Sequence, residues 1–217
     1  MKTSTALAQD RLVDGLSPAV RALALRGTMR SYRKNTVLVN EGEAGDATYV
    51  LLSGKVKIYA NDAHGHEIVY DIVLAGDYFA EMSLDGGPRT ASAMTLEASV
   101  CSVVDAVAMR MHLDHPAYAN EFMAHVTRRA RAMTLTAREL ALKDVYERVV
   151  STLEGQHGPA SPGTPITLAP LTHQTIASRV GASREMVSRL LKDLERGGYV
   201  ALGVRQITLM RKLPARW

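Results

Sequence analysis

Short apolar runs separated by turn residues fill the first half of the chain. They lie at 37–39, 49–52, 56–59, 68–74 and 91–104, with glycines or polar turns between them. Runs of about four to eight residues, with turn signals roughly every 8–12 residues, are typical of antiparallel β proteins. We therefore expect an antiparallel barrel or sandwich between about residues 31 and 110.

From about Pro116 the apolar positions change to a helical period. Small or apolar residues recur at a spacing of four and three, namely at Ala119, Met123, Val126, Ala130, Met133, Ala137 and Leu140. Such a heptad seam is typical of a helix that pairs with a second helix in a left-handed supercoil. The helix would span roughly 40 Å at 1.5 Å per residue, longer than a small barrel can cover. We predict a homodimer with Met123, Val126, Ala130, Met133, Ala137 and Leu140 at its interface; packing on the chain's own barrel is the alternative.

The last third of the chain has the pattern of a winged helix-turn-helix. Asp144 is a candidate N-cap for a helix over 145–153, and the Gly- and Pro-rich stretch 155–165 is expected to be a loop. Two short helical segments, 172–180 and 183–196, are separated by Gly181. Two apolar runs, 199–202 and 206–209, flank Gly203 and predict the hairpin of a wing.

Composition and charge narrow the function. Hydrophobic residues make up 47% and charged residues 22%, an ordinary globular balance. Residues 1–142 hold 15 Lys and Arg against 16 Asp and Glu, whereas residues 143–217 hold 11 against 6. The two net charges, −1 and +5, sum to the +4 of the chain, so the basic excess lies in the last third. This asymmetry favours a polyanionic partner for the C-terminal module.

Other features exclude several classes of protein. The single cysteine, Cys101, excludes internal disulfides, all-cysteine zinc sites and four-cysteine iron–sulfur clusters. No apolar run approaches the roughly 18 residues of a membrane helix, and the first residues lack a signal-peptide core. We expect a cytoplasmic protein without membrane contact. No nucleophile–base set, phosphate-binding loop or metal-ligand spacing indicates an enzyme.

The segment 183–196 carries the chemistry of a DNA-recognition helix. Arg184, Glu185, Ser188 and Arg189 cluster on its outward N-terminal face. Arginine can donate two hydrogen bonds to guanine O6 and N7, and glutamate can accept one from cytosine N4. Five further polar residues are placed for phosphate contacts: Thr172, His173, Gln174, Ser183 and Lys192.

The stretch LTHQTIASRVGASREMVSRLLKDLERGGYV resembles the DNA-binding domain of the CRP/FNR family of bacterial transcription regulators. The resemblance implies an α+β protein with a β-roll effector-sensing domain and an N-terminal helical segment (1–110), a dimerisation helix (111–142) and a winged helix-turn-helix (143–217). The motifs Arg-Glu-x-x-x-Arg and Glu-x-x-Ser-Arg are both present. The implied partners are therefore a palindromic double-stranded DNA, with TGTGA-like or TTGAT-like half-sites, and RNA polymerase.

The segment GDYFAEMSLDGGPRTASA (76–93) resembles the family's phosphate-binding cassette. Independently of the family, a carboxylate such as Glu81 can accept from a ribose hydroxyl and Arg89 can bind phosphate oxygens. The expected effector-binding residues are Ala80, Glu81, Met82, Arg89, Thr90, Met133 and Thr134. Ala80 stands where the family usually has glycine. Met133 and Thr134 align with two hydroxyl residues that touch adenine in cAMP-binding relatives, and Met133 lacks the hydroxyl.

We predict a homodimeric transcription regulator controlled by a small effector in the β-roll, with a cyclic nucleotide such as cAMP as the leading candidate. The alternative is a regulator of the same family that needs no effector, or one that responds to cyclic di-GMP or another ligand. For haem, nothing places His112, His115, His125 or Cys101 as an axial pair. We expect no permanently bound cofactor and no metal.

Overall fold

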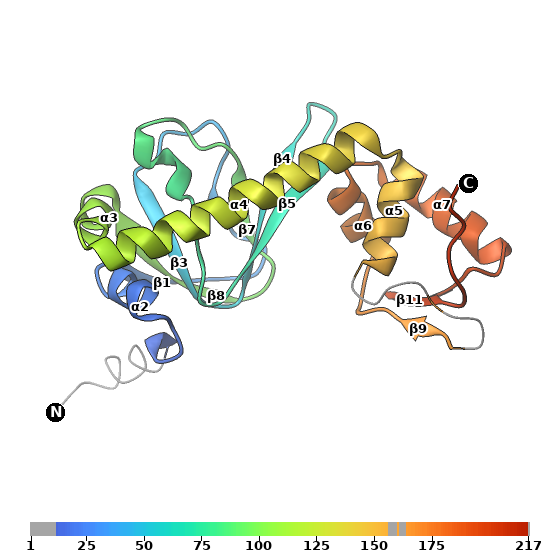
Figure 1. Cartoon of the computed structure of the whole chain (residues 1–217), viewed down its shortest axis with the longest axis horizontal. Helices are drawn as coiled ribbons and strands as arrows, with labels where there is room; N and C mark the ends of the chain where they lie inside the picture. The colour runs from blue at the N-terminus through green and yellow to red at the C-terminus, as the bar shows by residue number, and fades with distance from the viewer. Residues whose placement is uncertain (1–11, 156–159, 161–163, 217) are drawn as a thin grey trace. The chain divides into compact units, whose positions relative to one another are not determined.

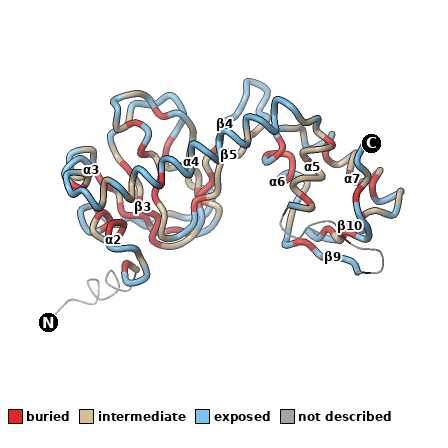
Figure 2. Tube along the Cα trace, viewed as in Figure 1, coloured by how far each residue is buried: buried red, intermediate tan, exposed pale blue. Residues whose placement is uncertain are grey.

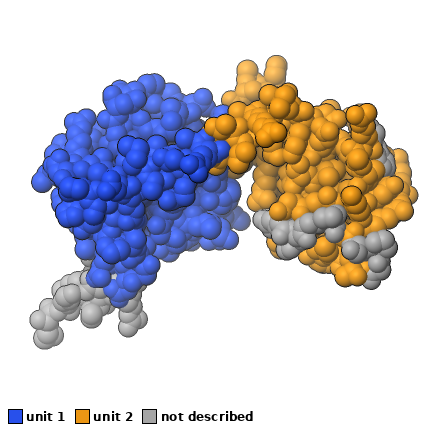
Figure 3. Space-filling view, viewed as in Figure 1, with its two compact units in different colours: residues 1–60, 70–131 blue, residues 61–69, 132–217 orange. Residues whose placement is uncertain are grey.

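The computed structural model describes residues 12–155, 160 and 164–216 and has the predicted α+β architecture (Figure 1). Most of the loop expected at 155–165 lies outside the described residues. The chain divides into two compact units, Met1–Ala60 with Tyr70–Arg131 and Asn61–Val69 with Ala132–Trp217 (Figure 3). One long helix is divided between the two units.

Two four-stranded sheets build the β-roll, with strand orders β1-β8-β3-β6 and β2-β7-β4-β5. The pairs β1–β8, β3–β8, β3–β6, β2–β7 and β4–β7 are antiparallel, as the sequence predicts. The strands are β1 (Thr28–Tyr32), β2 (Val37–Val39), β3 (Ala47–Ser53), β4 (Lys55–Asn61), β5 (Glu67–Leu74), β6 (Tyr78–Phe79), β7 (Ser92–Thr95) and β8 (Ser99–Asp105).

Strand β3 is buried on both faces, which explains its continuous apolar run (Figure 2). Successive side chains of a strand point to opposite faces. Leu51 accordingly packs inside the roll with Phe79, whereas Val50 and Leu52 pack under the helices that cover the first sheet. The roll thus has an interior core and a second core beneath a helical layer.

Two short helices supply that layer. Helix α2 (Pro18–Ala24) begins at Ser17, whose hydroxyl accepts from the backbone N–H of Val20. Helix α3 (Ala106–Leu113) begins at Asp105, whose carboxylate accepts from the backbone N–H of Ala108. The strand pattern expected to continue to about residue 110 therefore ends at 105, because Asp105 caps a helix that the sequence analysis did not foresee.

The long helix α4 (Pro116–Leu142) carries the predicted heptad seam on a face that is open in the single chain. Met123 is 62% exposed, and Val126, Met133 and Leu140 are also exposed. By contrast His125 is only 3% exposed, because its face of the helix packs on the roll. None of the helices in the described part of the chain is long and apolar enough to cross a lipid bilayer.

The second unit contains the winged helix-turn-helix. Its elements are α5 (Val145–Glu154), β9 (Ile166–Thr167), α6 (His173–Val180), α7 (Arg184–Arg196), β10 (Val200–Gly203) and β11 (Gln206–Leu209), and its sheet has the order β10-β11-β9. Thr172, Gly181 and Ser183 are helix caps of α6 and α7. Ile176, Val187, Leu191 and Leu194 form its core with apolar residues of α5 and the sheet. The predicted organisation of this segment is confirmed, with β9 as an additional strand.

Candidate effector site and DNA-binding face

The cassette turn follows β6 and opens the short 3-10 helix η1 (Glu81–Asp85). Ala80, the residue before this helix, has the left-handed backbone conformation, with φ of 66°. Glycine adopts this conformation without a steric penalty, whereas the Cβ of alanine lies too close to the following carbonyl oxygen. The glycine-to-alanine departure noted in the sequence therefore falls on a strained position, directly beside the buried carboxylate of Glu81.

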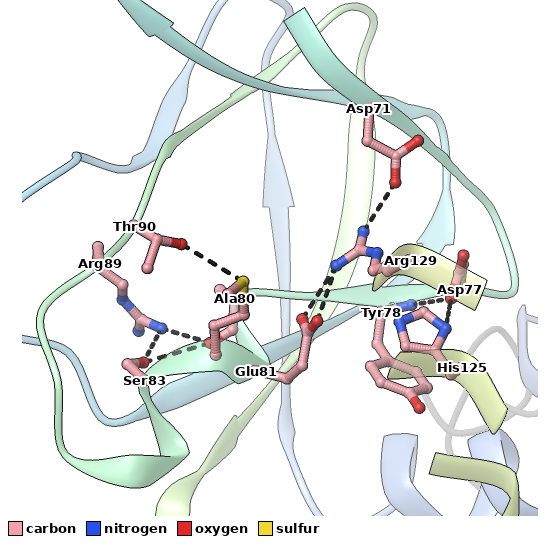
Figure 4. A network of polar contacts seen from close by, with 11 residues as sticks. Asp71, Asp77, Tyr78, Ala80, Glu81, Ser83, Arg89, Thr90, His125 and Arg129 are labelled. Atoms are coloured by element: carbon pink, nitrogen blue, oxygen red, sulfur yellow. Dashed lines mark hydrogen bonds and ion pairs between the residues drawn. The ribbon is translucent and has the colours of Figure 1, made fainter. Parts of the chain in front are cut away.

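Arg89 is buried, at 8% exposure, and lies against the cassette turn (Figure 4). Its guanidinium donates to the carbonyl oxygen of Ala80 and to the hydroxyl of Ser83, both in the cassette. It also donates to the carbonyl oxygen of Ala47, 2.8 Å away. A Cβ on Gly45 would overlap the guanidinium, so a larger residue there would displace Arg89. Neither Ala47 nor Gly45 was predicted as part of the site, because both lie more than 40 residues before Arg89.

Glu81 makes an ion pair that the sequence analysis missed. Nη1 of Arg129, on α4, lies 3.0 and 3.1 Å from the two carboxylate oxygens of Glu81, and its Nη2 lies 3.1 Å from Oδ2 of Asp71 (Figure 4). The Glu81 side chain is 3% exposed and that of Arg129 is 20% exposed. Burial alone lowers the pKa of Arg129, but the charges of Glu81 and Asp71 raise it above its ordinary value. This ion triad ties the middle of α4 to the cassette.

A second polar contact joins α4 to the roll one helical turn earlier. Nδ1 of His125 lies 3.0 Å from Oδ1 of Asp77, and the imidazole stacks on Tyr78 with ring centres 4.0 Å apart. Burial raises the pKa of Asp77, but the hydrogen bond and charge of His125 outweigh it and leave the pKa below its ordinary value. His125 and Arg129 are four residues apart and therefore share one face of α4.

The predicted cassette residues meet around one recess of about 50 Å³. Ala80, Glu81, Met82, Arg89 and Thr90 line it, together with Arg129 and apolar residues of the roll. Met82 is 63% exposed, and the hydroxyl of Thr90 donates to its sulfur. Sites for drug-sized ligands usually enclose roughly 300 Å³ or more. The recess is therefore smaller than most such sites.

Met133 and Thr134, the two predicted adenine contacts, are exposed on α4. They follow Arg129 by four and five residues and are not among the described residues that line the recess. Their assignment to the effector remains a prediction.

The outward face of α7 has the features of a nucleic-acid surface. Arg184, Glu185, Arg189 and Lys192 are exposed, and none of their side chains forms a hydrogen bond or ion pair with another residue in the described ranges. Val187 and Leu191, on the opposite side of the helix, are fully buried. The core thus fixes the helix and leaves its charged side chains free to contact a partner.

Other predicted DNA contacts have partners within the domain. Thr172 and Ser183 accept from backbone N–H groups at the first turns of α6 and α7. The side-chain amide of Gln174 donates weakly to Ser178, 3.4 Å away. Nδ1 of His173 lies 2.9 Å from Oγ of Ser188, a contact that joins the two helices. Sequence reasoning placed both residues at the DNA surface but did not foresee that they meet.

Arg205 is a candidate contact that the sequence analysis missed. Val204 and Arg205 form the two-residue turn of the wing, with Val204 97% exposed and Arg205 in the left-handed conformation. Arg205 borders a surface hollow of about 380 Å³ that His173 and Arg184 also line. A basic residue at the tip of a predicted wing was the signal available in the sequence.

Comparisons with known proteins agree with this geometry. Residues 29–115 match the model "Cyclic nucleotide-binding domain" and residues 147–213 match "Crp-like helix-turn-helix domain". The "CRP-like cAMP-activated global transcriptional regulator" of Mycobacterium tuberculosis (strain H37Rv) is 31% identical over 209 residues, 94% of this chain and 93% of that protein. This chain belongs to the CRP/FNR family of transcription regulators. As a family member it is a DNA-binding transcription regulator with a cyclic-nucleotide-binding domain.

Further relatives and solved structures have names that give different effectors. The "Cyclic AMP receptor protein" of Thermus thermophilus is 31% identical over 216 residues, 93% of this chain and 95% of the relative. Among solved structures, the c-di-GMP responsive regulator CLP of Xanthomonas campestris superposes with a TM-score of 0.76 at 23% identity, covering 88% of this chain and 97% of CLP. At that identity the likeness to CLP concerns the fold alone.

Proposed function

We propose that this regulator is a homodimer that binds palindromic DNA under the control of a small anionic effector, with a cyclic nucleotide such as cAMP as the favoured class. One observation supports this most strongly. A buried acid and a buried base, Glu81 and Arg89, lie at the same recess, and Glu81 is also bound by Arg129 of the long helix. Because the regulator acts on DNA, we place its activity in the cytoplasm.

The effector would bind by exchanging partners with these groups. A phosphate would replace neutral oxygen acceptors of Arg89, such as the Ser83 hydroxyl, with a stronger charged acceptor. A ribose hydroxyl would donate to Glu81 and so change its ion pair with Arg129. A ligand that acts on this pair acts on α4. Allosteric couplings of this kind are typically worth about 1–3 kcal/mol.

The exposed seam of α4 is the proposed dimer interface. Met123, Val126 and Met133 are apolar side chains that water covers in the single chain. Burial of apolar surface stabilises a protein by about 25 cal/mol per Å², so pairing two such seams is favourable. In the dimer, the two α7 helices would lie about 34 Å apart, one turn of DNA. RNA polymerase is a further proposed partner, on the basis of the family.

The DNA contacts are tested by alanine substitution on α7. Arg184→Ala and Arg189→Ala should each weaken binding to a palindromic duplex by about 5- to 150-fold per half-site, equivalent to about 1–3 kcal/mol per lost bidentate contact. Arg196→Ala is the matched control, because Arg196 lies at the far end of the same helix, 3.2 Å from Asp193. Unchanged affinity in both test variants would refute the recognition-face assignment.

Calorimetric titration with cAMP, cGMP and cyclic di-GMP tests the effector. We expect cyclic-nucleotide binding that Arg89→Lys weakens strongly, because lysine keeps the charge but cannot form the guanidinium fork. Occupation of the site by the effector should change the affinity of the protein for DNA. Binding of cyclic di-GMP alone would replace the favoured ligand class by the dinucleotide.

A specific observation favours a second candidate, a regulator that needs no effector. Arg89 already has three protein acceptors, Glu81 already has Arg129, and the recess is small. On this hypothesis the roll and α4 are held together by the chain's own side chains. Tight, salt-dependent DNA binding without ligand, together with no heat from any of the three nucleotides, would favour this candidate over the first.

A further inference from the structure

The contact between His173 and Ser188 links two residues of the proposed DNA surface. His173 is the first residue of α6, Ser188 lies on α7, and both are half-buried. Their side chains meet at 2.9 Å, between imidazole Nδ1 and hydroxyl Oγ. The inference below depends on the proposed DNA-binding function of this face.

The chemistry of the pair allows two arrangements. A neutral imidazole has one nitrogen that donates and one that accepts, whereas a protonated imidazole donates from both. A serine hydroxyl carries a single hydrogen and can also accept. If Nδ1 accepts, the Ser188 hydrogen is used within the protein and Ser188 can only accept from DNA. If Nδ1 carries a proton, Ser188 accepts from it and its own hydrogen is free.

Neighbouring contacts favour one arrangement in the neutral state. Ser178, on α6, donates to the carbonyl oxygen of Gln174 one turn earlier, 3.0 Å away. Ser188 makes no such bond to α7, and within the described ranges Nδ1 of His173 is the acceptor available to its hydroxyl. If the Ser188 hydroxyl donates to Nδ1, the neutral imidazole carries its proton on Nε2, which can then donate to a phosphate.

The surroundings of the imidazole are basic. Arg184 and Lys192 face it from α7, and Arg205 of the wing turn borders the same hollow. Desolvation, followed by the charges of Arg184 and Lys192, lowers the pKa of His173 below its ordinary value. This shift favours the neutral imidazole in the free protein. A DNA phosphate beside Nε2 would favour the protonated form and move the titration upward.

We propose that His173 is a positioning residue that sets whether the Ser188 hydroxyl accepts or donates at the base edges. With neutral His173, Ser188 accepts and favours the amino groups of adenine N6 and cytosine N4. With protonated His173, Ser188 donates and favours guanine O6 or N7 and thymine O4. A base preference at one half-site position is therefore coupled to the charge of a residue at the phosphate backbone.

The experiment is a competition among palindromic duplexes that carry every single base-pair change in the half-site, at pH 5.5 and 8.0 and constant ionic strength. For the wild type, preference at one position should change by about 3- to 10-fold between the two pH values, the size of one net hydrogen bond. His173→Gln should keep the pH 8.0 preference at both values, because its amide oxygen accepts from Ser188 and does not titrate.

Ser188→Ala is the matched control. It should lose the preference and its pH dependence while it retains the salt dependence of DNA binding. A wild-type preference that is the same at both pH values, or a pH dependence that persists in His173→Gln or Ser188→Ala, would overturn the inference. Failure of the wild type to bind any palindrome would contradict the proposed function itself, which is a distinguishable result.

Nuclear magnetic resonance of the free protein provides a measurement that needs no DNA. Nitrogen shifts of the His173 imidazole should show the Nε2–H form at pH 8.0. Ser188→Ala should change the pKa of His173, because it removes the hydroxyl bonded to Nδ1. An Nδ1–H form at pH 8.0, or an unchanged pKa, would refute the assigned hydrogen-bond direction.

Discussion

Replacing Arg129 by methionine tests whether the ion triad holds α4 on the β-roll. Methionine keeps most of the side-chain length but removes the guanidinium, so the carboxylate of Glu81, 3% exposed, loses its counter-charge. Removing one partner of a buried pair typically costs about 3–5 kcal/mol. The Arg129 side chain is 20% exposed and Asp71 is 40% exposed, so Asp71 can be rehydrated. We therefore expect a loss near the lower end, about 3 kcal/mol.

The double variant Glu81→Gln with Arg129→Met separates the lost ion pair from a general disturbance. With no charge left to bury, its unfolding free energy should return to within about 1 kcal/mol of the wild type, since apolar or neutral replacement of a buried pair is often tolerated. The thermodynamic cycle should give a coupling of at least about 2 kcal/mol between the two residues, within the range for side chains in contact.

The assay is urea unfolding followed by circular dichroism at one fixed protein concentration, because dimerisation makes stability depend on concentration. Arg128→Met is the matched control. Arg128 is an exposed neighbour on α4 whose side chain has no hydrogen bond or ion pair to any described residue, so its loss should cost less than about 0.5 kcal/mol. The reasoning fails if Arg129→Met matches this control, or if the double variant loses the sum of both single losses.

Three further predictions concern the roll and the seam. Ala80→Gly should raise stability by about 0.5 kcal/mol, because glycine accepts the left-handed φ of 66°; an unchanged or lower melting temperature in calorimetry would contradict this. Val126→Lys should convert the dimer into a monomer in sedimentation velocity at micromolar concentration, and an intact dimer would remove the seam assignment. The lowered pKa of Asp77 means that its ionised form stabilises the fold. This contribution is complete above the ordinary pKa of about 3.9 and disappears as pH falls through the lowered pKa. Asp77→Asn should therefore flatten the loss of stability below pH 4. A curve of stability against pH that runs parallel to that of the wild type would exclude the His125 contact as its source.

Elements with a strong period or a clear cap could be predicted from the sequence. Asp144, the predicted N-cap, accepts from the backbone N–H of Glu147 at the start of α5. The seam of α4 was visible because a helical repeat of four and three is a local property. The short helix α3 was not visible, since its eight residues follow a strand without a turn residue and only Asp105 marks the change.

The charged contacts of the site could be predicted only in part. Helical spacing places His125 and Arg129 on one face of α4, beside the seam. It does not identify their partners, because Arg129 meets Glu81 and Asp71 across 48 and 58 residues of chain. Arg128 has the same charge and almost the same position in the sequence, yet it is exposed. Which of the two arginines pairs with Glu81 depends on the rotation of the helix against the sheet. Packing of the whole unit determines this rotation.

The triad also constrains how an effector could act. Glu81 has two carboxylate oxygens, and Arg129 lies within hydrogen-bond distance of both through one nitrogen. A ligand hydroxyl could add to a free lone pair and leave Arg129 in place, or it could displace Arg129 and expose the roll–helix contact. Linkage requires that a ligand favoured by the docked helix also favours docking, by the same factor. Arg129→Met separates the two cases, because it should weaken binding of a ligand that shares Glu81 with Arg129 and strengthen binding of one that must displace it.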